Sequence, residues 1–263
     1  MPFTQHDSIC YYTFDSLAGQ PLTQAAFTRQ GGASRGDFAS LNVGSTLGDE
    51  LADVQANMQA VFEAVDRPRG SIFDSWLVHG DRVLVADAPR APEVQRPEQA
   101  DIILTDKPEV SLFMRYADCV PLLFYDPRQH AIALAHAGWK GTVLKVGAKA
   151  VAAMAATYGS RPGDLIAGIG PSISAEHYEI GPEVADEVRA AFGAQAEDLL
   201  PGFGDSTHFD LWAANRVTLE HAGVGRVEIA GQCTYAHNED WFSHRASGGR
   251  TGRFGVLLAL EPQ

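Results

Sequence analysis

The chain has 263 residues, of which 45% are hydrophobic and 20% charged, as in an ordinary globular protein. Its formal net charge of -13 at pH 7 opposes binding to nucleic acid or to an anionic membrane. No apolar run reaches the roughly 18 residues of a membrane span, and the first residues lack the pattern of a secretion signal. Three widely spaced cysteines (Cys10, Cys119 and Cys233) form no disulfide framework, so we expect a reducing, cytoplasmic compartment.

The N-terminal part of the chain predicts strands around a single helix. A Gly- and Ser-rich loop follows the first strand, and its glycines permit positive φ and close backbone approach. Apolar residues at helical spacing begin after Asp49, which is a candidate N-cap. The expected elements are strands at 24–29, 75–78 and 82–86, a helix that runs from Asp49 to 65, and a Pro-rich surface loop at 88–99.

The remaining chain mixes strands and helices without a strict alternation. The expected elements are strands at 101–105, 110–116, 120–125, 131–135, 165–169, 227–230 and 254–260, and helices at 142–157, 182–192 and 210–221. The first four strands are joined by turns too short for helices, which favours hairpins in an antiparallel or mixed sheet. Thr142 and Asp210 are candidate caps. Residues 1–263 show no repeat or flexible linker and predict a single α+β domain.

Three side chains with metal-binding or nucleophilic chemistry stand at the edges of apolar strands: His79, Cys119 and His136. Two histidines and one cysteine suit Zn²⁺ with a fourth position open, and copper also accepts these ligands. Their intervals match no zinc finger, so the alternative remains that each is a separate structural residue. Asp118, next to Cys119, would orient a ligand from outside or cap a turn.

Basic residues gather near the C-terminus of this acidic chain. Between 244 and 255 there is no acidic residue, and the arginines are Arg245, Arg250 and Arg253. Such a cluster suits a small anion or a solvated loop. Arg29 opens the Gly-rich loop, Lys140 lies in a Gly-bracketed turn, and Asn42 is a candidate for a ligand hydrogen bond. For each of these the alternative is a turn or surface role.

Eight segments in chain order resemble those of a known family: FTRQGGASRGDFASLNVG, VHGDRV, ADCVPLLFYD, AHAGWKGT, AGIGPSISAEHYEIG, CT, FSHR and TGRFG. The family is the laccase-domain family, similar to multicopper polyphenol oxidases. Its members are regarded as purine nucleoside phosphorylases, and some are called peptidoglycan editing factors. The resemblance covers nearly the whole chain.

The resemblance implies a single-domain, four-layer α/β/β/α sandwich with mixed sheets. It also implies a Zn²⁺ site made by His79, Cys119 and His136, with Cu²⁺ as the alternative metal. Two positions depart from the family pattern. Lys140 stands where Arg is usual, which weakens bidentate anion binding, and His244 stands where Tyr is common.

The implied reaction is phosphorolysis of adenosine, guanosine or inosine to the base and ribose 1-phosphate. Adenosine deamination and methylthioadenosine phosphorolysis are implied side activities. On this basis we assign Arg29, Arg245 and Lys140 to phosphate and Asn42 to substrate. The expected partners are nucleosides and phosphate, with no nucleic acid and no membrane, and we expect a monomer.

Three other functions remain open at the level of sequence. The first is an oxidoreductase, either a copper phenol oxidase or an enzyme acting on a cell-wall precursor. Four-electron oxygen reduction would need more copper than one His₂Cys site holds. A Cys-His hydrolase would use Cys119 as nucleophile and His136 as base. A structural zinc module would need a closed ligand set.

Overall fold

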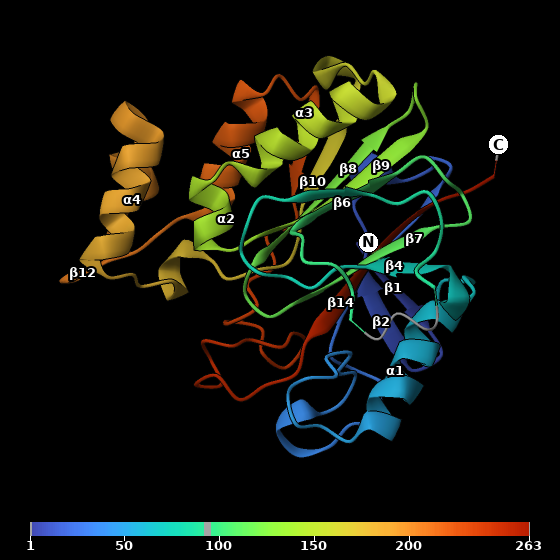
Figure 1. Ribbon diagram of the computed structural model, residues 1–263. Helices are drawn as coiled ribbons and strands as arrows, with labels where there is room; N and C mark the ends of the chain where they lie inside the picture. The colour runs from blue at the N-terminus through green and yellow to red at the C-terminus, as the bar shows by residue number, and fades with distance from the viewer. Residues whose placement is uncertain (1, 92–95, 263) are drawn as a thin grey trace.

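Two six-stranded sheets lie face to face, and helices cover the outer face of each (Figure 1). The computed structural model describes residues 2–91 and 96–262. The layers follow the order α/β/β/α, with parallel and antiparallel pairs in both sheets. This confirms the α+β four-layer sandwich with mixed sheets that the sequence resemblance implied. No helix in the described part of the chain has the length and apolarity that a membrane crossing requires.

The first sheet has the strand order β1-β2-β3-β14-β7-β4 and the second β13-β10-β8-β9-β6-β5. The strands are β1 (Phe3–His6), β2 (Ile9–Tyr12), β3 (Leu22–Phe27), β4 (Ile72–Asp74), β5 (Val83–Val85), β6 (Ile102–Thr105), β7 (Ser111–Tyr116), β8 (Val120–Asp126), β9 (Ala131–Ala137), β10 (Ile166–Ile169), β11 (Gly202–Phe203), β12 (Ser206–Thr207), β13 (Arg226–Ile229) and β14 (Phe254–Leu260). Strands β11 and β12 form a separate ribbon.

Helices α3 and α5 lie over the second sheet, and α1 covers the first sheet on the opposite side of the molecule (Figure 1). The α-helices are α1 (Leu51–Glu63), α2 (Trp139–Val143), α3 (Val146–Tyr158), α4 (Pro182–Phe192) and α5 (Leu211–His221). The 3₁₀ turns are η1 (Asp15–Leu17), η2 (Gly36–Phe38), η3 (Arg69–Ser71), η4 (Pro162–Asp164), η5 (Ala175–His177), η6 (Gly193–Gln195) and η7 (Glu197–Leu199).

Three apolar layers fill the spaces between the four layers of secondary structure. Leu122 and Met154 belong to the layer between the second sheet and its helices. Leu123 lies in the layer between the two sheets. Because side chains alternate along a strand, neighbouring residues of β8 serve both layers. Phe62 of α1 packs on Phe113 of the first sheet, with ring centroids 5.7 Å apart.

The predicted strands near the centre of the chain are present, but their pairing differs from the prediction. Strands β8 and β9 form the expected antiparallel hairpin, with Val120 opposite Ala137. Strand β6 pairs with β9, whereas β7 lies in the other sheet between β14 and β4. The prediction of successive hairpins was therefore wrong for β6 and β7. Short connections that change sheets have the same sequence pattern as hairpin turns.

Some predicted strand limits also need correction. The strand predicted at 75–78 lies earlier, at β4, and the segment that ends at His79 is irregular apart from a bridge between Trp76 and Gln99. The sequence pattern missed β1 and β2, the first of which is exposed throughout. Of the loop predicted at 88–99, residues 92–95 lie outside the described residues, and the others form no regular strand or helix.

The predicted helices are present with changes at their ends. The helix predicted at 142–157 is two helices, because Lys145 adopts a left-handed conformation with φ 57° that interrupts the hydrogen-bond ladder. Thr142 therefore lies inside α2 and caps no helix. Glu50, and not Asp49, precedes α1, and no side chain caps that helix. Asp210 caps α5 as predicted, accepting a hydrogen bond from Ala213 N at 2.9 Å.

A buried polar network ties the Gly-rich loop to helix α1. The carboxamide of Asn57 accepts a hydrogen bond from Ala33 N (2.7 Å) and donates to Ser34 Oγ, Ser40 O and Asn42 O. The contacts with Ser34 Oγ and Asn42 O are buried and the other two are partly buried, so loss of the carboxamide would leave buried groups unsatisfied. The network fixes the loop that carries Asn42.

We predict that Asn57→Ala lowers the free energy of unfolding by about 3 kcal/mol, because several buried loop groups lose their partner. Urea unfolding measures this change. Gln59→Ala, at an exposed position of the same helix, is the matched control and should stay within about 0.5 kcal/mol of wild type. Equal losses in the two variants would contradict the structural role of the network.

Candidate metal and substrate site

The structure brings the three predicted ligands, His79, Cys119 and His136, together. One donor atom from each lies within 4.8 Å of the others, and Cys119 Sγ is 3.9 Å from His79 Nε2. Cys119 directly precedes β8, and His136 lies at the adjoining end of β9 because the two strands are antiparallel. A Cβ at Gly138 would lie 2.9 Å from Cys119 Sγ, so only glycine fits beside the thiol.

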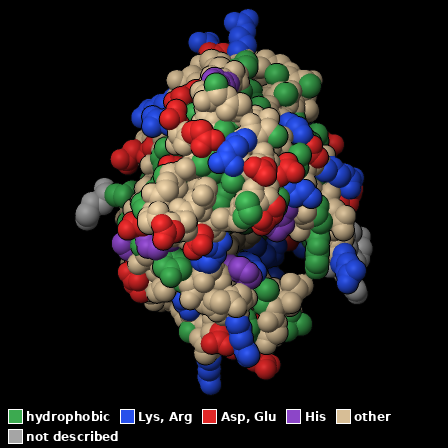
Figure 2. All heavy atoms as spheres, turned by 90° about the vertical axis from the view of Figure 1, so that its left-hand side faces the viewer, with side chains coloured by type: hydrophobic (Ala, Val, Ile, Leu, Met, Phe, Trp, Pro, Cys, Tyr) green, Lys and Arg blue, Asp and Glu red, His purple; other side chains and the backbone are tan. Residues whose placement is uncertain are grey.

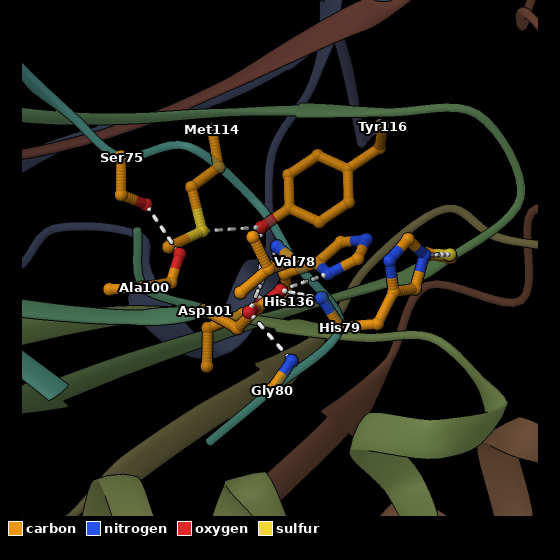
Figure 3. A network of polar contacts seen from close by, with 11 residues as sticks. Ser75, Val78, His79, Gly80, Ala100, Asp101, Met114, Tyr116 and His136 are labelled. Carbon is orange, nitrogen blue, oxygen red and sulfur yellow. Dashed lines mark hydrogen bonds and ion pairs between the residues drawn. The ribbon is translucent and has the colours of Figure 1, made fainter. Parts of the chain in front are cut away.

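The Asp101 carboxylate, buried just before β6, organises both histidines (Figure 3). Its Oδ1 lies 2.8 Å from His136 Nδ1 and accepts a hydrogen bond from His79 N at 3.0 Å. Its Oδ2 accepts from Val78 N (3.2 Å) and Gly80 N (2.8 Å). His79 has φ 58°, and these three consecutive N–H contacts stabilise that uncommon conformation. Asp101 thus positions one imidazole through its ring and the other through its backbone.

The charges of the cluster favour a thiolate. Burial alone would raise the pKa of the Cys119 thiol, but the nearby His136 and His79 lower that pKa from 9.0 to about 6. Burial alone would lower the pKa of His136, but Cys119 and Asp101 raise that pKa from 6.5 to about 9. A thiolate is the form of cysteine that binds metals and attacks electrophiles.

The three donors fit a metal ion of the zinc type. Tetrahedral Zn²⁺ with ordinary Zn–N and Zn–S bonds places neighbouring donors about 3.3–3.7 Å apart, and the 3.9 Å between Cys119 and His79 is close to this. Because His136 Nδ1 is engaged by Asp101, its Nε2 is the atom left for the ion. His79 is exposed and Cys119 partly exposed, so the fourth position is accessible from the cavity.

The cluster lies in the wall of a cavity of about 730 Å³. Figure 2 shows a hollow in one face of the molecule with basic and histidine side chains around its mouth. Aromatic side chains line the cavity together with the basic ones: Trp76, Trp139, Tyr178, Arg90, Arg96, Arg115, His244, Arg245 and Arg253. Apolar walls with a few convergent polar groups are typical of small-molecule sites.

The arginines of the cavity fall into two groups. Arg90 and Arg115 bind one buried carboxylate, Asp74, at 2.5 and 2.8 Å. Arg245 and Arg253 have no carboxylate partner among the described residues. Arg245 donates to Glu179 O, and Arg253 to the carbonyls of residues 251 and 252. Two cationic groups without a carboxylate partner in a cavity wall attract an anion.

Arg29 does not lie in the cavity. Its Nε donates to Ala39 O at 2.7 Å, one terminal nitrogen donates to Asn238 O at 2.8 Å, and the guanidinium lies over the Phe242 ring. These contacts tie the Gly-rich loop to the C-terminal loop. The side chain predicted to bind phosphate is therefore committed to the protein itself.

Asn42 and Lys140 also lie apart from the cavity lining. Asn42 is fully buried, and its Oδ1 accepts hydrogen bonds from Gly44 N and Arg253 N, so it holds the backbone of a cavity arginine. Lys140 is exposed on α2. Of the four residues assigned to substrate or phosphate from the sequence, the structure brings only Arg245 to the cavity.

Asp118 joins the loops around Cys119. Its carboxylate accepts hydrogen bonds from Thr234 Oγ1 (2.6 Å) and Arg245 N (2.7 Å), and its φ is 86°. The residue lies in the turn before β8 and orients the loops on both sides of Cys119 through these hydrogen bonds. The sequence analysis did not select Asp101 or Arg115. Like Asp118, both are charged residues at the edge of an apolar strand or within one. That placement is the signal that could have identified them.

The sequence and fold comparisons give the family. The sequence profile described as multi-copper polyphenol oxidoreductase laccase matches residues 23–261, and the chain belongs to this family. A relative from Bacteroides thetaiotaomicron named purine nucleoside phosphorylase is 35% identical over 93% of this chain and 95% of its own length. A relative of the same name from Deinococcus radiodurans is 39% identical over 91% of this chain and 89% of its own length.

Solved structures give the same relationship. The hypothetical protein YfiH of Bacillus licheniformis matches with a TM-score of 0.90 and 31% identity, and YlmD of Geobacillus stearothermophilus with 0.91 and 28%. Each comparison covers 99% of both chains. The four-layer fold is therefore shared along the whole chain.

We predict that Asp101→Asn weakens metal binding about 10- to 100-fold, because the amide cannot accept hydrogen bonds from both histidines and still hold the backbone turn. Competition with a chromophoric zinc chelator measures the affinity.

Asp81→Asn is the matched control, since Asp81 is exposed in the same loop and contacts Lys149. Its zinc affinity should equal that of wild type. If Asp101→Asn also binds zinc as wild type does, Asp101 does not position the ligands.

Proposed function

We propose that the protein is a metal-dependent purine nucleoside phosphorylase. One observation carries the proposal: a cluster of His79, Cys119 and His136 that suits a metal ion shares a cavity with Arg245 and Arg253, which have no carboxylate partner among the described residues. Phosphorolysis needs both an anion site for phosphate and stabilisation of a departing base. The names of the relatives from Bacteroides thetaiotaomicron and Deinococcus radiodurans support the same reaction.

Phosphate binding is assigned to Arg245 and Arg253. The reaction forms a bond between a phosphate oxygen and C1′ and breaks the bond between C1′ and the purine nitrogen, whose electron pair leaves with the base. A guanidinium binds a phosphate through two parallel hydrogen bonds and keeps its charge at every physiological pH. Arg245 keeps the role proposed from the sequence, and Arg253 takes the place of Arg29 and Lys140.

Stabilisation of the departing purine base is assigned to a metal ion held by the candidate ligands. Bound Zn²⁺ would supply Lewis-acid charge where negative charge collects on the purine. In this assignment His79, Cys119 and His136 hold the ion, and Asp101 keeps the imidazoles oriented. Adenosine, guanosine and inosine are the proposed substrates. Adenosine deamination and methylthioadenosine phosphorolysis are the proposed side activities, because both substrates carry an adenine base joined to C1′ of a furanose.

A Cys-His hydrolase is the second candidate, favoured by one specific observation. The site contains an acid, a base and a nucleophile, in this spatial order: Asp101, His136 and Cys119. The pKa of the Cys119 thiol is also lowered despite its burial. The family relationship and the arginines favour phosphorolysis instead. The products distinguish the two, because hydrolysis consumes water and needs no phosphate.

We predict that incubation with adenosine, inosine and guanosine gives free base and ribose 1-phosphate only when phosphate is present. Chromatography identifies the products. Zinc removal by a chelator should abolish turnover, and added zinc should restore it. Equal product without phosphate would favour the hydrolase, and no product from any of the three nucleosides would contradict the proposed function.

We predict that Arg253→Gln raises the KM for phosphate about tenfold and leaves the KM for nucleoside within about twofold, because a charge-assisted hydrogen bond to the anion is lost. Steady-state kinetics with each substrate varied in turn measures the split. Arg250→Gln is the matched control in the same loop, since Arg250 is exposed and pairs with Asp37. A larger effect on nucleoside than on phosphate would reject the phosphate role.

A further inference from the structure

An exposed tryptophan, Trp76, lines the cavity three residues before His79 in the chain. Among the described residues, six large hydrophobic side chains are exposed: Phe3, Leu51, Trp76, Val78, Val85 and Phe203. Trp76, with 39% of its surface exposed, is the one member of this set that lines the cavity. An indole exposed in a cavity wall offers a flat apolar surface at the place where a ligand must bind.

The backbone holds Trp76 in a fixed position. Its N–H donates to Glu98 O at 2.8 Å, and its carbonyl accepts from Ala100 N at 3.2 Å. On either side, Ser75 Oγ donates to Ala100 O and Val78 N donates to the Asp101 carboxylate. The segment that carries the indole is thus hydrogen-bonded to residues 100 and 101, and the carboxylate of Asp101 also holds the backbone of His79. A segment whose backbone is ordered before the ligand arrives loses little conformational freedom on binding.

The indole has an available contact surface. The Arg96 guanidinium lies over the ring, 5.7 Å from its centroid. Within residues 2–91 and 96–262, no aromatic ring packs against it. A cation over an aromatic ring occupies one face, and the 39% exposure of Trp76 leaves ring surface in the cavity wall for a second flat group. A purine base has the size and shape to stack there, and base–aromatic stacking is indifferent to which purine is bound.

We propose that Trp76 is the stacking residue for the purine base. This inference rests on the proposed nucleoside function and specifies how the base is bound. The cavity wall then has separate binding groups for two parts of the reaction, with Trp76 for the base and Arg245 and Arg253 for phosphate. A stacking contact accepts adenine, guanine and hypoxanthine alike, so it provides affinity for the class of purines and not a choice among them.

The experiment compares wild type with Trp76→Ala and Trp76→Phe, using adenosine as the probe. Trp76→Ala should raise the Kd for adenosine, measured calorimetrically, about tenfold, whereas Trp76→Phe should stay within about threefold because it keeps an aromatic face. The KM for nucleoside should follow the Kd, and the KM for phosphate should stay within about twofold of wild type. Phe203→Ala is the matched control, an exposed aromatic residue outside the cavity lining.

Intrinsic fluorescence gives a second measurement. The chain has four tryptophans, and adenosine stacked on Trp76 should quench emission in wild type and lose most of that quenching in Trp76→Phe. An unchanged Kd in Trp76→Ala, or full quenching in Trp76→Phe, would overturn the proposal. Absence of phosphorolysis by wild type would instead overturn the proposed function, and adenosine binding would still decide the role of Trp76.

Discussion

The Asp101 carboxylate holds the site together, because it contacts both histidines of the candidate metal-ligand cluster at once. It binds the ring of His136 and the backbone of His79, which come from a strand and from an irregular segment. Burial alone would raise the pKa of Asp101, but His136 and the N–H groups of Gly80 and Val78 lower it below its usual value. A buried carboxylate with this many donors stays ionised and rigid. The positions of two ligands thus depend on one charge, and the antiparallel hairpin of β8 and β9 places the third beside them.

The electrostatic character of the cavity differs from that of the whole molecule. A net charge of -13 opposes polyanions, yet the cavity wall carries several arginines. Arg115 is balanced by Asp74, while Arg253 keeps its charge toward the cavity and is held through its backbone by Asn42. This arrangement suits a small anion that enters a concave site and disfavours a long anionic polymer that must cover the outer surface. The Gly-rich loop contributes to the site indirectly, because its network with Asn57 fixes Asn42.

The ligand trio and the fold were predictable because their signals are local or belong to the family. Cys119 and His136 flank apolar runs, and the resemblance of whole segments implied the four layers. The pairing of β7 with β14 was not predictable, since residues about 140 apart in the chain meet only after the two sheets form. Arg29 looked like an anion ligand beside glycines, but its guanidinium donates to two protein carbonyls, one of which, Asn238 O, comes from a distant loop. Asp101 was overlooked because a lone acid before a strand has many possible roles, and its contacts appear only when three segments converge.

X-ray absorption spectroscopy at the zinc edge of the metal-loaded protein tests the central claim most directly, because it reports the atoms bound to the ion. The account predicts one sulfur at about 2.3 Å and nitrogen or oxygen neighbours at about 2.0–2.1 Å. The sulfur contribution should disappear in Cys119→Ser, because Cys119 supplies the one thiolate of the cluster. A first shell of nitrogen and oxygen alone in the wild-type protein would show that the His79, Cys119 and His136 cluster does not bind the metal, and would contradict the account.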